Sequence, residues 1–157
     1  MSEMNQSQLL LQNIKAAFRE ITDAPASLSA QEIRALSAQQ FQSIFNDLKV
    51  QIKGSEYLPY EQGSIFIYNH LDNHPSLVAA DHFQITLDSH YISGLLYKYY
   101  KDPGIRVARH SLAEESNHKS YYDRFDYIRV YSQNFTPHHL TKKAVSYTHL
   151  TLPTKVR

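Results

Sequence analysis

The sequence contains no cysteine and no tryptophan, and only four of its 157 residues are glycine. Without cysteine, neither a disulfide framework nor a cysteine-based zinc site can form. The formal net charge is +1, which argues against a strongly electrostatic nucleic-acid binder. No apolar run approaches the roughly 20 residues that a membrane-spanning helix needs, and the polar N-terminus lacks the pattern of a signal peptide. We expect one domain with a sizeable core, either soluble or peripheral to a membrane.

Residues 1–48 carry two apolar patterns with helical spacing. The first consists of Leu10, Ile14, Ala17, Phe18 and Ile21, and the second of Ile33, Leu36, Phe41, Ile44, Phe45 and Leu48. Pro25 separates the two predicted helices, and Ser29 with Glu32 forms a capping box that begins the second. We expect both helices to pack on the rest of the domain. The alternative is that an apolar face enters a membrane surface, although neither helix is notably basic.

From residue 49 onward the pattern changes to short strands that alternate with helices. The strands are predicted at 49–54, 64–68, 105–109 and 127–132, and the helices at 75–83, 89–100 and 114–125. Pro75 is expected in the first turn of one helix and Asp88 at the N-cap of the next. This alternation predicts an α/β fold, in which an N-terminal helical pair precedes a mainly parallel sheet with flanking helices over residues 49–144.

The last 13 residues, 145–157, differ from the rest of the chain. The decapeptide VSYTHLTLPT, residues 145–154, resembles the in-frame translation of a transposase adapter used to prepare DNA sequencing libraries. This resemblance implies that residues 145–157 are an artefact and that the protein's own sequence continues past about residue 144. We therefore expect a truncated sheet with an unpaired edge, and a fragment that is inactive and poorly stable.

Two Asn-His pairs follow the apolar run 64–68. Asn69 and His70 come directly after it, and the pair recurs at residues 73–74. Functional sites of open α/β sheets gather at the carboxyl ends of strands. A neutral imidazole at such a position can take a proton from a substrate hydroxyl, and a nearby carboxylate can fix its tautomer. Asp72 is the carboxylate nearest to His70 in the sequence, so these two residues are the predicted catalytic pair.

The stretches IKGSEYLP and GSIFIYNH together resemble the glycerolipid acyltransferase family, which includes the lysophosphatidate acyltransferases. The residues that fit the family's turn are Gly54, Glu56, Leu58 and Pro59, and residues 65–70 fit its apolar strand ending in Asn-His. The resemblance covers about residues 49–132. It implies that His70 deprotonates a glycerol hydroxyl, which then attacks the thioester of acyl-CoA or acyl carrier protein. It also implies a substrate-binding position for Asn69.

The sequence departs from the family at the aspartate that orients the histidine. The family places this aspartate five residues after the histidine, where this chain has Pro75, which cannot orient an imidazole. Asp72 is the remaining candidate. If His74 were the base instead, the corresponding position would be Ala79, so that register fits no better.

Arg109 matches a second family motif, a strand of the form Ile-x-Val-x-Arg whose arginine holds the substrate phosphate. The match is IRVAR at residues 105–109, and a guanidinium suits a phosphate because it can bind two oxygens at once. A second register over residues 127–132 places Ser132 at the arginine position. The alternative is that Arg109 is a surface residue at a strand end. A third motif, Glu-Gly-Thr-Arg, is expected near or beyond the point where the adapter-like tail begins.

Two other functions stay open. The alternating residues His70, Asp72 and His74 would share one side of an extended segment and could bind zinc. The tyrosine-rich stretch 91–100 would suit a non-catalytic lipid- or protein-binding module. The other histidines are predicted to be surface residues: His82, His90, His110, His118, His138 and His139.

The family resemblance implies an acyltransferase of the cytoplasm that is peripheral to the membrane. Its acceptor would be a lysophospholipid or glycerol phosphate, and its acyl donor a thioester co-substrate. We expect no metal, no bound cofactor and no nucleic-acid partner.

Overall fold

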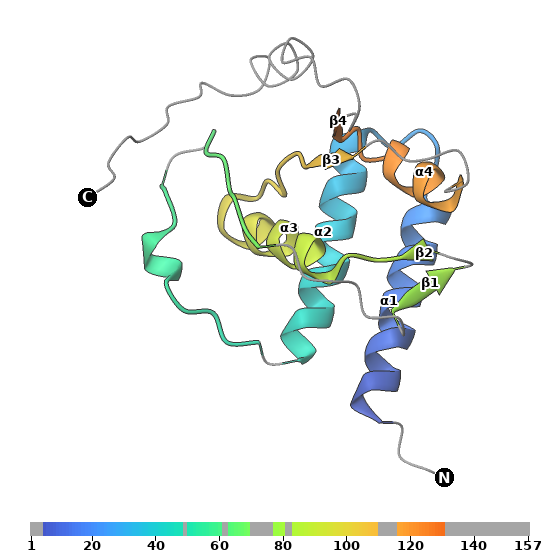
Figure 1. Ribbon diagram of the computed structural model, residues 1–157, viewed down its shortest axis with the longest axis horizontal. Helices are drawn as coiled ribbons and strands as arrows, with labels where there is room; N and C mark the ends of the chain where they lie inside the picture. Colours follow the sequence, from blue (N-terminus) through green and yellow to red (C-terminus); the bar gives the residue numbers. More distant parts are fainter. Residues whose placement is uncertain are drawn as a thin grey trace.

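The computed structural model describes residues 5–48, 50–60, 63–69, 77–80, 83–109 and 116–130 (Figure 1). The elements in chain order are α1 (Gln6–Asp23), α2 (Ala30–Asp47), the 3₁₀ helix η1 (Ser55–Tyr57), β1 (Val78–Ala80), β2 (Phe83–Gln84), α3 (Leu87–Tyr100), β3 (Val107–Arg109), α4 (Ser116–Asp123) and β4 (Ile128–Val130). The mixture of helices and strands agrees at this level with the predicted α/β class. The helical pair at the N-terminus is also as predicted.

Both N-terminal helices begin at capping boxes. The Ser29 hydroxyl accepts from the backbone N–H of Glu32 at 3.3 Å, and the Glu32 carboxylate accepts from the backbone N–H of Ser29 at 2.7 Å. This confirms the box predicted from the sequence. Asn5 and Gln8 form an equivalent box at the start of α1. The free carbonyls at the other end of α1 are bound by the Arg124 guanidinium, which donates to the oxygens of Thr22 and Pro25 at 3.1 and 2.9 Å.

The apolar face of α1 lies in the core. Ile14, Ala17 and Ile21 are buried there with side chains from β2 and α4. The ring of Phe18 lies 4.9 Å from that of Phe83 and 5.3 Å from that of Tyr121, measured between centroids. Protein therefore covers this face of α1, as predicted.

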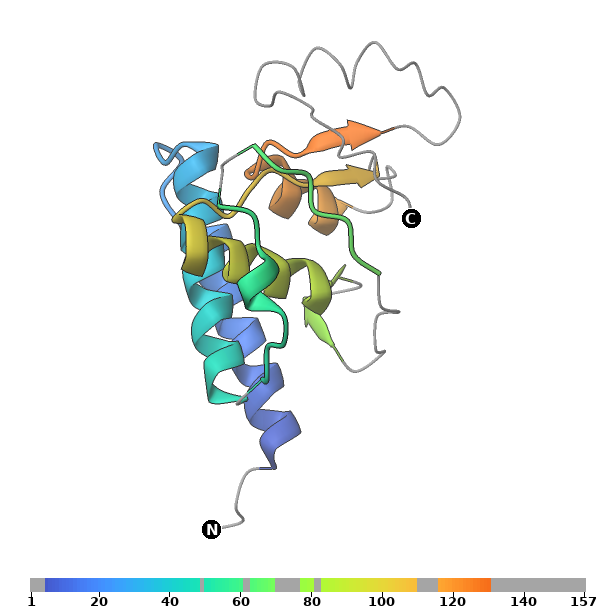
Figure 2. The ribbon, with the colours of Figure 1, turned by 90° about the vertical axis from the view of Figure 1, so that its left-hand side faces the viewer.

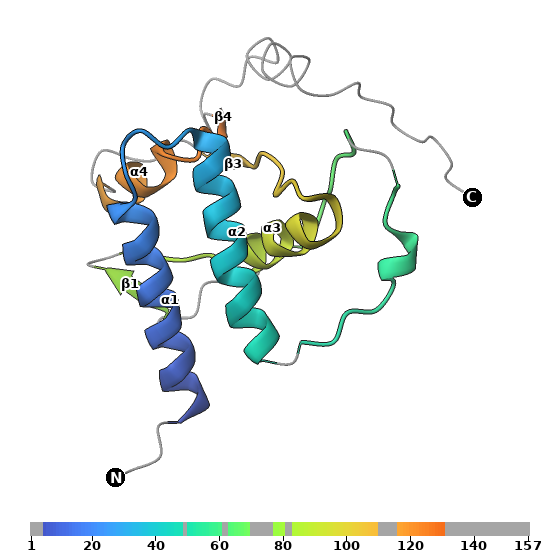
Figure 3. The ribbon, with the colours of Figure 1, turned by 180° about the vertical axis from the view of Figure 1, so that it is seen from behind.

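Helices α1 and α2 lie side by side, and α3 crosses α2 steeply (Figure 3). Gly94 permits the close approach of α2 and α3. A Cβ atom built at this position would lie 3.3 Å from the carbonyl oxygen of Ala38 and 3.4 Å from the backbone nitrogen of Gln42. Ser37 and Ser93, which precede Ala38 and Gly94 in the sequence, are also buried.

Strands β3 and β4 are parallel, and α4 connects them (Figure 2). The register pairs Val107 with Ile128 and Arg109 with Val130. A parallel pair needs such a crossover because a tight turn cannot join strands that run in the same direction. This β–α–β unit agrees with the prediction of strands within 105–109 and 127–132 and a helix between them.

Four predictions of local structure were wrong. Residues 50–54 and 64–68 are not strands, and Ile67 is 92% exposed, so the second stretch is extended but not buried. The predicted helix over 75–83 overlaps β1 and the start of β2, which pair antiparallel and bury Phe83 in the core. The described strands thus form two separate pairs, of which only β3–β4 is parallel.

The fourth error concerns the start of α3. Thr86 holds the N-cap position, and its side chain makes no capping hydrogen bond. Asp88 lies inside the first turn, where its carboxylate accepts from the backbone N–H of Ser89 at 2.7 Å. Helix α3 therefore begins at Leu87, two residues before the start predicted from Asp88 as the N-cap. Leu87 packs against the core cluster, and this tertiary contact accompanies the earlier start.

None of the helices in the described ranges is both long enough and apolar enough to cross a membrane.

Candidate functional site

The predicted catalytic pair, His70 and Asp72, lies outside the described residues, and so does the alternative base His74. Asn69 is described and is exposed at the end of the extended segment 63–69. One residue earlier, the Tyr68 hydroxyl donates to the Ser89 hydroxyl at 3.0 Å. This bond holds the segment against the first turn of α3 at a point two residues before His70, the predicted base.

Arg109 is the last residue of β3, so it lies at the carboxyl end of the parallel pair. Figure 2 shows that the arrowheads of β3 and β4 point to the side of the molecule toward which segment 63–69 runs. The segment that precedes His70 and the strand that ends at Arg109 therefore both end on one side of the fold. That side is where parallel sheets carry their sites.

His90 forms the centre of a buried hydrogen-bond chain. Its Nδ1 lies 2.7 Å from the carbonyl oxygen of Thr86 and its Nε2 lies 3.1 Å from the hydroxyl of Tyr121. A carbonyl oxygen only accepts, so Nδ1 carries the proton and Nε2 accepts from Tyr121.

The prediction that His90 lies at the surface was wrong, because its side chain is 1% exposed. Its ring packs 4.3 Å from that of Phe41, on the face of α3 that meets α2 and α4. Burial, together with the positive charge of Arg106, holds the His90 pKa well below its usual range. The imidazole is therefore neutral, with both nitrogens bonded, and acts as a core residue.

Arg106 lies directly before β3 and points toward α3 and β4. Its Nε donates to the Ser93 hydroxyl at 3.1 Å, and its Cζ lies 5.3 Å from the ring centroid of Tyr127. Tyr127 is 4% exposed. Burial raises the pKa of the Tyr127 phenol far above its usual value, while the positive charges of Arg106 and Arg34 oppose this rise. The phenol is therefore neutral, and the Arg106 guanidinium lies beside its ring.

The sequence analysis missed Arg106 because the family motif directed attention to Arg109. The alternation of a strand places Arg106 on the same face as Ala108, which packs against the core cluster. That alternation was a usable signal for an inward-pointing arginine. Ser93 and Tyr127 come from other elements, and no local pattern connects them to it.

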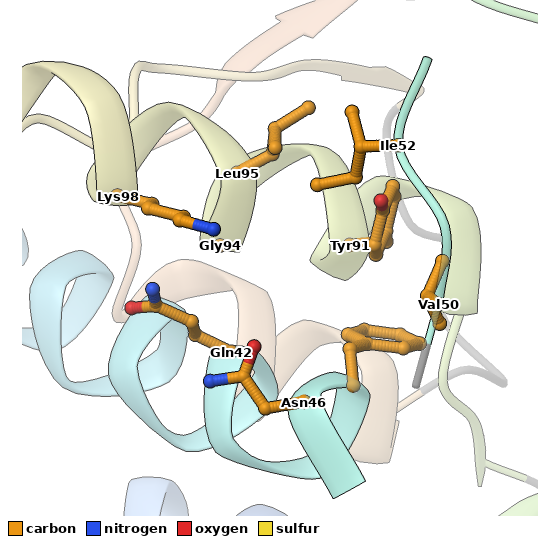
Figure 4. Close-up of a pocket in the computed structure, with 9 residues that line it drawn as sticks. Gln42, Asn46, Val50, Ile52, Tyr91, Gly94, Leu95 and Lys98 are labelled. Carbon is orange, nitrogen blue, oxygen red and sulfur yellow. The ribbon is translucent and has the colours of Figure 1, made fainter. Parts of the chain in front are cut away.

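A shallow hollow lies between α2, α3 and the chain at residues 50–52 (Figure 4). It is lined by Gln42, Phe45, Asn46, Val50, Ile52, Tyr91, Gly94, Leu95 and Lys98. Its volume is about 40 Å³, far below the roughly 300 Å³ at which ligand pockets begin. This hollow therefore cannot enclose a fatty acyl chain.

Within the described ranges, no group of three histidine, cysteine or acidic side chains is arranged to hold a metal ion. The alternation of His70, Asp72 and His74 falls outside those ranges, so the zinc hypothesis stays a prediction.

Comparisons with protein-family models, with curated proteins and with solved structures found no match to this chain. The resemblance to glycerolipid acyltransferases therefore rests on the motifs in the sequence.

Proposed function

We propose that this chain belongs to an acyltransferase that moves a fatty acyl group from a thioester carrier to a hydroxyl of a lysophospholipid or glycerol phosphate. The observation that carries the proposal is the place of the IRVAR motif. Its last three residues form β3, which ends at Arg109 in a parallel β–α–β unit. An arginine at the carboxyl end of a parallel strand is well placed to bind a phosphate.

The turn before segment 63–69 gives further support. Gly54 has φ of 84°, in the left-handed region that glycine adopts without strain, and η1 follows it directly. The family's turn motif thus falls on a real turn. The segment then runs extended to Asn69, and His70 is the next residue.

In the proposed reaction His70 takes the proton of the acceptor hydroxyl. The hydroxyl oxygen attacks the thioester carbonyl carbon, a C–O bond forms and the C–S bond breaks. The proton on His70 passes to the departing thiolate, which leaves as a free thiol. Asp72 orients the imidazole, and Arg109 and Asn69 hold the acceptor. General-base catalysis of this kind accelerates a reaction by roughly 10²- to 10⁴-fold.

A second candidate function is a non-catalytic lipid- or protein-binding module. The observation that favours it is the exposure of apolar and aromatic side chains before His70. Tyr57 is 84% exposed, Tyr60 98% and Ile67 92%. Exposed side chains of this kind, when they gather, mark surfaces that meet a membrane or a partner. In the acyltransferase proposal the same side chains would face the membrane that supplies the acceptor, at the cytoplasmic surface.

The test compares acceptors with and without a phosphate. The full-length protein is given acyl-CoA with either lysophosphatidate or monoacylglycerol, and the released thiol is measured. We expect turnover with lysophosphatidate, and a raised KM for it in Arg109→Gln. The control is Arg19→Gln, which removes an exposed arginine of α1 and should leave KM unchanged. Vesicle binding without any thiol release would contradict the enzyme and support the binding module.

A further inference from the structure

Two arginines that contact residues 125–127 have only neutral partners within the described ranges. Arg106 donates through Nε to the Ser93 hydroxyl at 3.1 Å, and Arg34, in α2, donates through Nη1 to the Phe125 carbonyl at 2.6 Å. Both side chains are half-buried. Both contact the same short segment: Arg34 bonds to the Phe125 carbonyl, and Arg106 Cζ lies 5.3 Å from the ring centroid of Tyr127, whose ring is 5.0 Å from that of Phe125.

No carboxylate of the described ranges lies within ion-pair distance of Arg34 or Arg106. Asp123, the nearest acidic residue on α4, pairs with Lys119 and with Arg129, the latter at 3.4 Å. Within the part of the chain that the structure describes, neither Arg34 nor Arg106 forms an ion pair. Removing charge from water without a counter-charge costs free energy, so half-buried arginines are normally paired.

One unused guanidinium nitrogen is buried, and the others are accessible. Among the described residues, Arg34 Nε is the one buried side-chain nitrogen or oxygen without a hydrogen-bond partner. The Nη2 of Arg34 and both Nη atoms of Arg106 also lack a protein partner. Of these unpartnered guanidinium nitrogens only Arg34 Nε is buried, so the other three are accessible to solvent. A buried polar atom without a partner often marks the place of a bound ion or water.

We propose that Arg34 and Arg106 form a binding site for a phosphate-type oxyanion. A guanidinium presents paired N–H donors that match two oxygens of a phosphate, and a doubly charged anion balances two arginines. The ligand is either free phosphate or the phosphate headgroup of a lipid, which share this chemistry. The proposal goes beyond the proposed acyltransferase and does not depend on it, because none of its residues belongs to the predicted acyltransferase site.

The test measures binding of inorganic phosphate to the full-length protein by calorimetry, at constant ionic strength set with sodium chloride. We expect saturable binding that weakens at least about tenfold in Arg106→Gln, because that variant loses hydrogen bonds from a charged group to the anion. Arg106→Lys, which keeps the charge but loses the paired donors, should bind with intermediate affinity. Arg19→Gln should bind phosphate as the wild type does, with circular dichroism as the check on folding.

A second arm separates the two sources of phosphate. Cosedimentation is measured with phosphatidylcholine vesicles, with and without phosphatidate. Binding that needs both phosphatidate and Arg106 supports a lipid headgroup, and saturable calorimetric binding alone supports free phosphate. The proposal is overturned if neither ligand binds, or if binding is unchanged in folded Arg106→Gln. Loss of acyl transfer with phosphate binding intact would contradict the proposed function and leave this site standing.

Discussion

Protonation of His90 should make the stability of this protein depend on pH. In the folded chain the imidazole is buried and neutral, and its pKa lies well below the usual value because of burial and the charge of Arg106. In the unfolded chain it takes up a proton as the pH falls through about 6.5. The unfolded state then binds more protons than the folded state, so the free energy of unfolding falls with the pH.

The size of this effect follows from the unfolded pKa. While the folded imidazole stays neutral, the free energy of unfolding falls by about 1.4 kcal/mol per pH unit below about 6.5. Between pH 7.5 and pH 5 the loss from His90 is therefore about 2 kcal/mol. The contribution is fully present above the unfolded pKa and is lost below it. A loss of this size is a large fraction of the 5–15 kcal/mol that is typical of a folded domain.

The assay is urea unfolding at several pH values in matched variants. His90→Gln removes the titrating group, and Tyr121→Phe removes only the hydroxyl bonded to it. Each should lower the free energy of unfolding at pH 7.5 by roughly 1–3 kcal/mol, because each leaves a buried partner unsatisfied. Only His90→Gln should reduce the loss between pH 7.5 and pH 5, by about 2 kcal/mol. Equal pH dependence in the wild type and His90→Gln would refute the reasoning.

Four further substitutions test the packing and a helix cap. Gly94→Val should destabilise the protein by roughly 1–3 kcal/mol in urea unfolding, because the added atoms meet the backbone of α2. A more stable variant would contradict the close approach of α2 and α3. Phe41→Ala should cost roughly 3–5 kcal/mol in the same assay, since the ring is fully buried. Ser29→Ala should cost roughly 0.5–2 kcal/mol and Ser43→Ala, at an exposed position of α2, nearly nothing; equal losses would mean that the cap contributes nothing.

The helices could be predicted because their signals are local. The capping box at Ser29 and the apolar spacing of residues 10–21 each lie within a few turns of one helix. Strand β3 was predicted by a local alternation in the same way. These features depend on neighbours in the sequence, so tertiary contacts did not change them.

The errors arose where contacts between distant residues decide the outcome. The run 64–68 has the composition of a buried strand, but Ile67 is exposed and no described strand pairs with the run. His90 looks like a surface residue until Tyr121, 31 positions away, supplies its hydrogen bond. The hydrogen bond from Arg106 to Ser93 likewise depends on how α3 packs beside β3, which no local pattern in the sequence shows. For the candidate site, the sequence alone provided His70 and Asp72, and the structure added the position of Arg109.

The most direct test of the proposed function is acyl transfer by the full-length protein and its His70→Ala variant. Release of thiol from acyl-CoA is followed with lysophosphatidate as acceptor, and circular dichroism checks that both proteins are folded. We predict that the wild type turns over and that His70→Ala is slower by roughly 10²- to 10⁴-fold. Turnover in His70→Ala equal to that of the wild type, or none in either folded protein, would contradict the account.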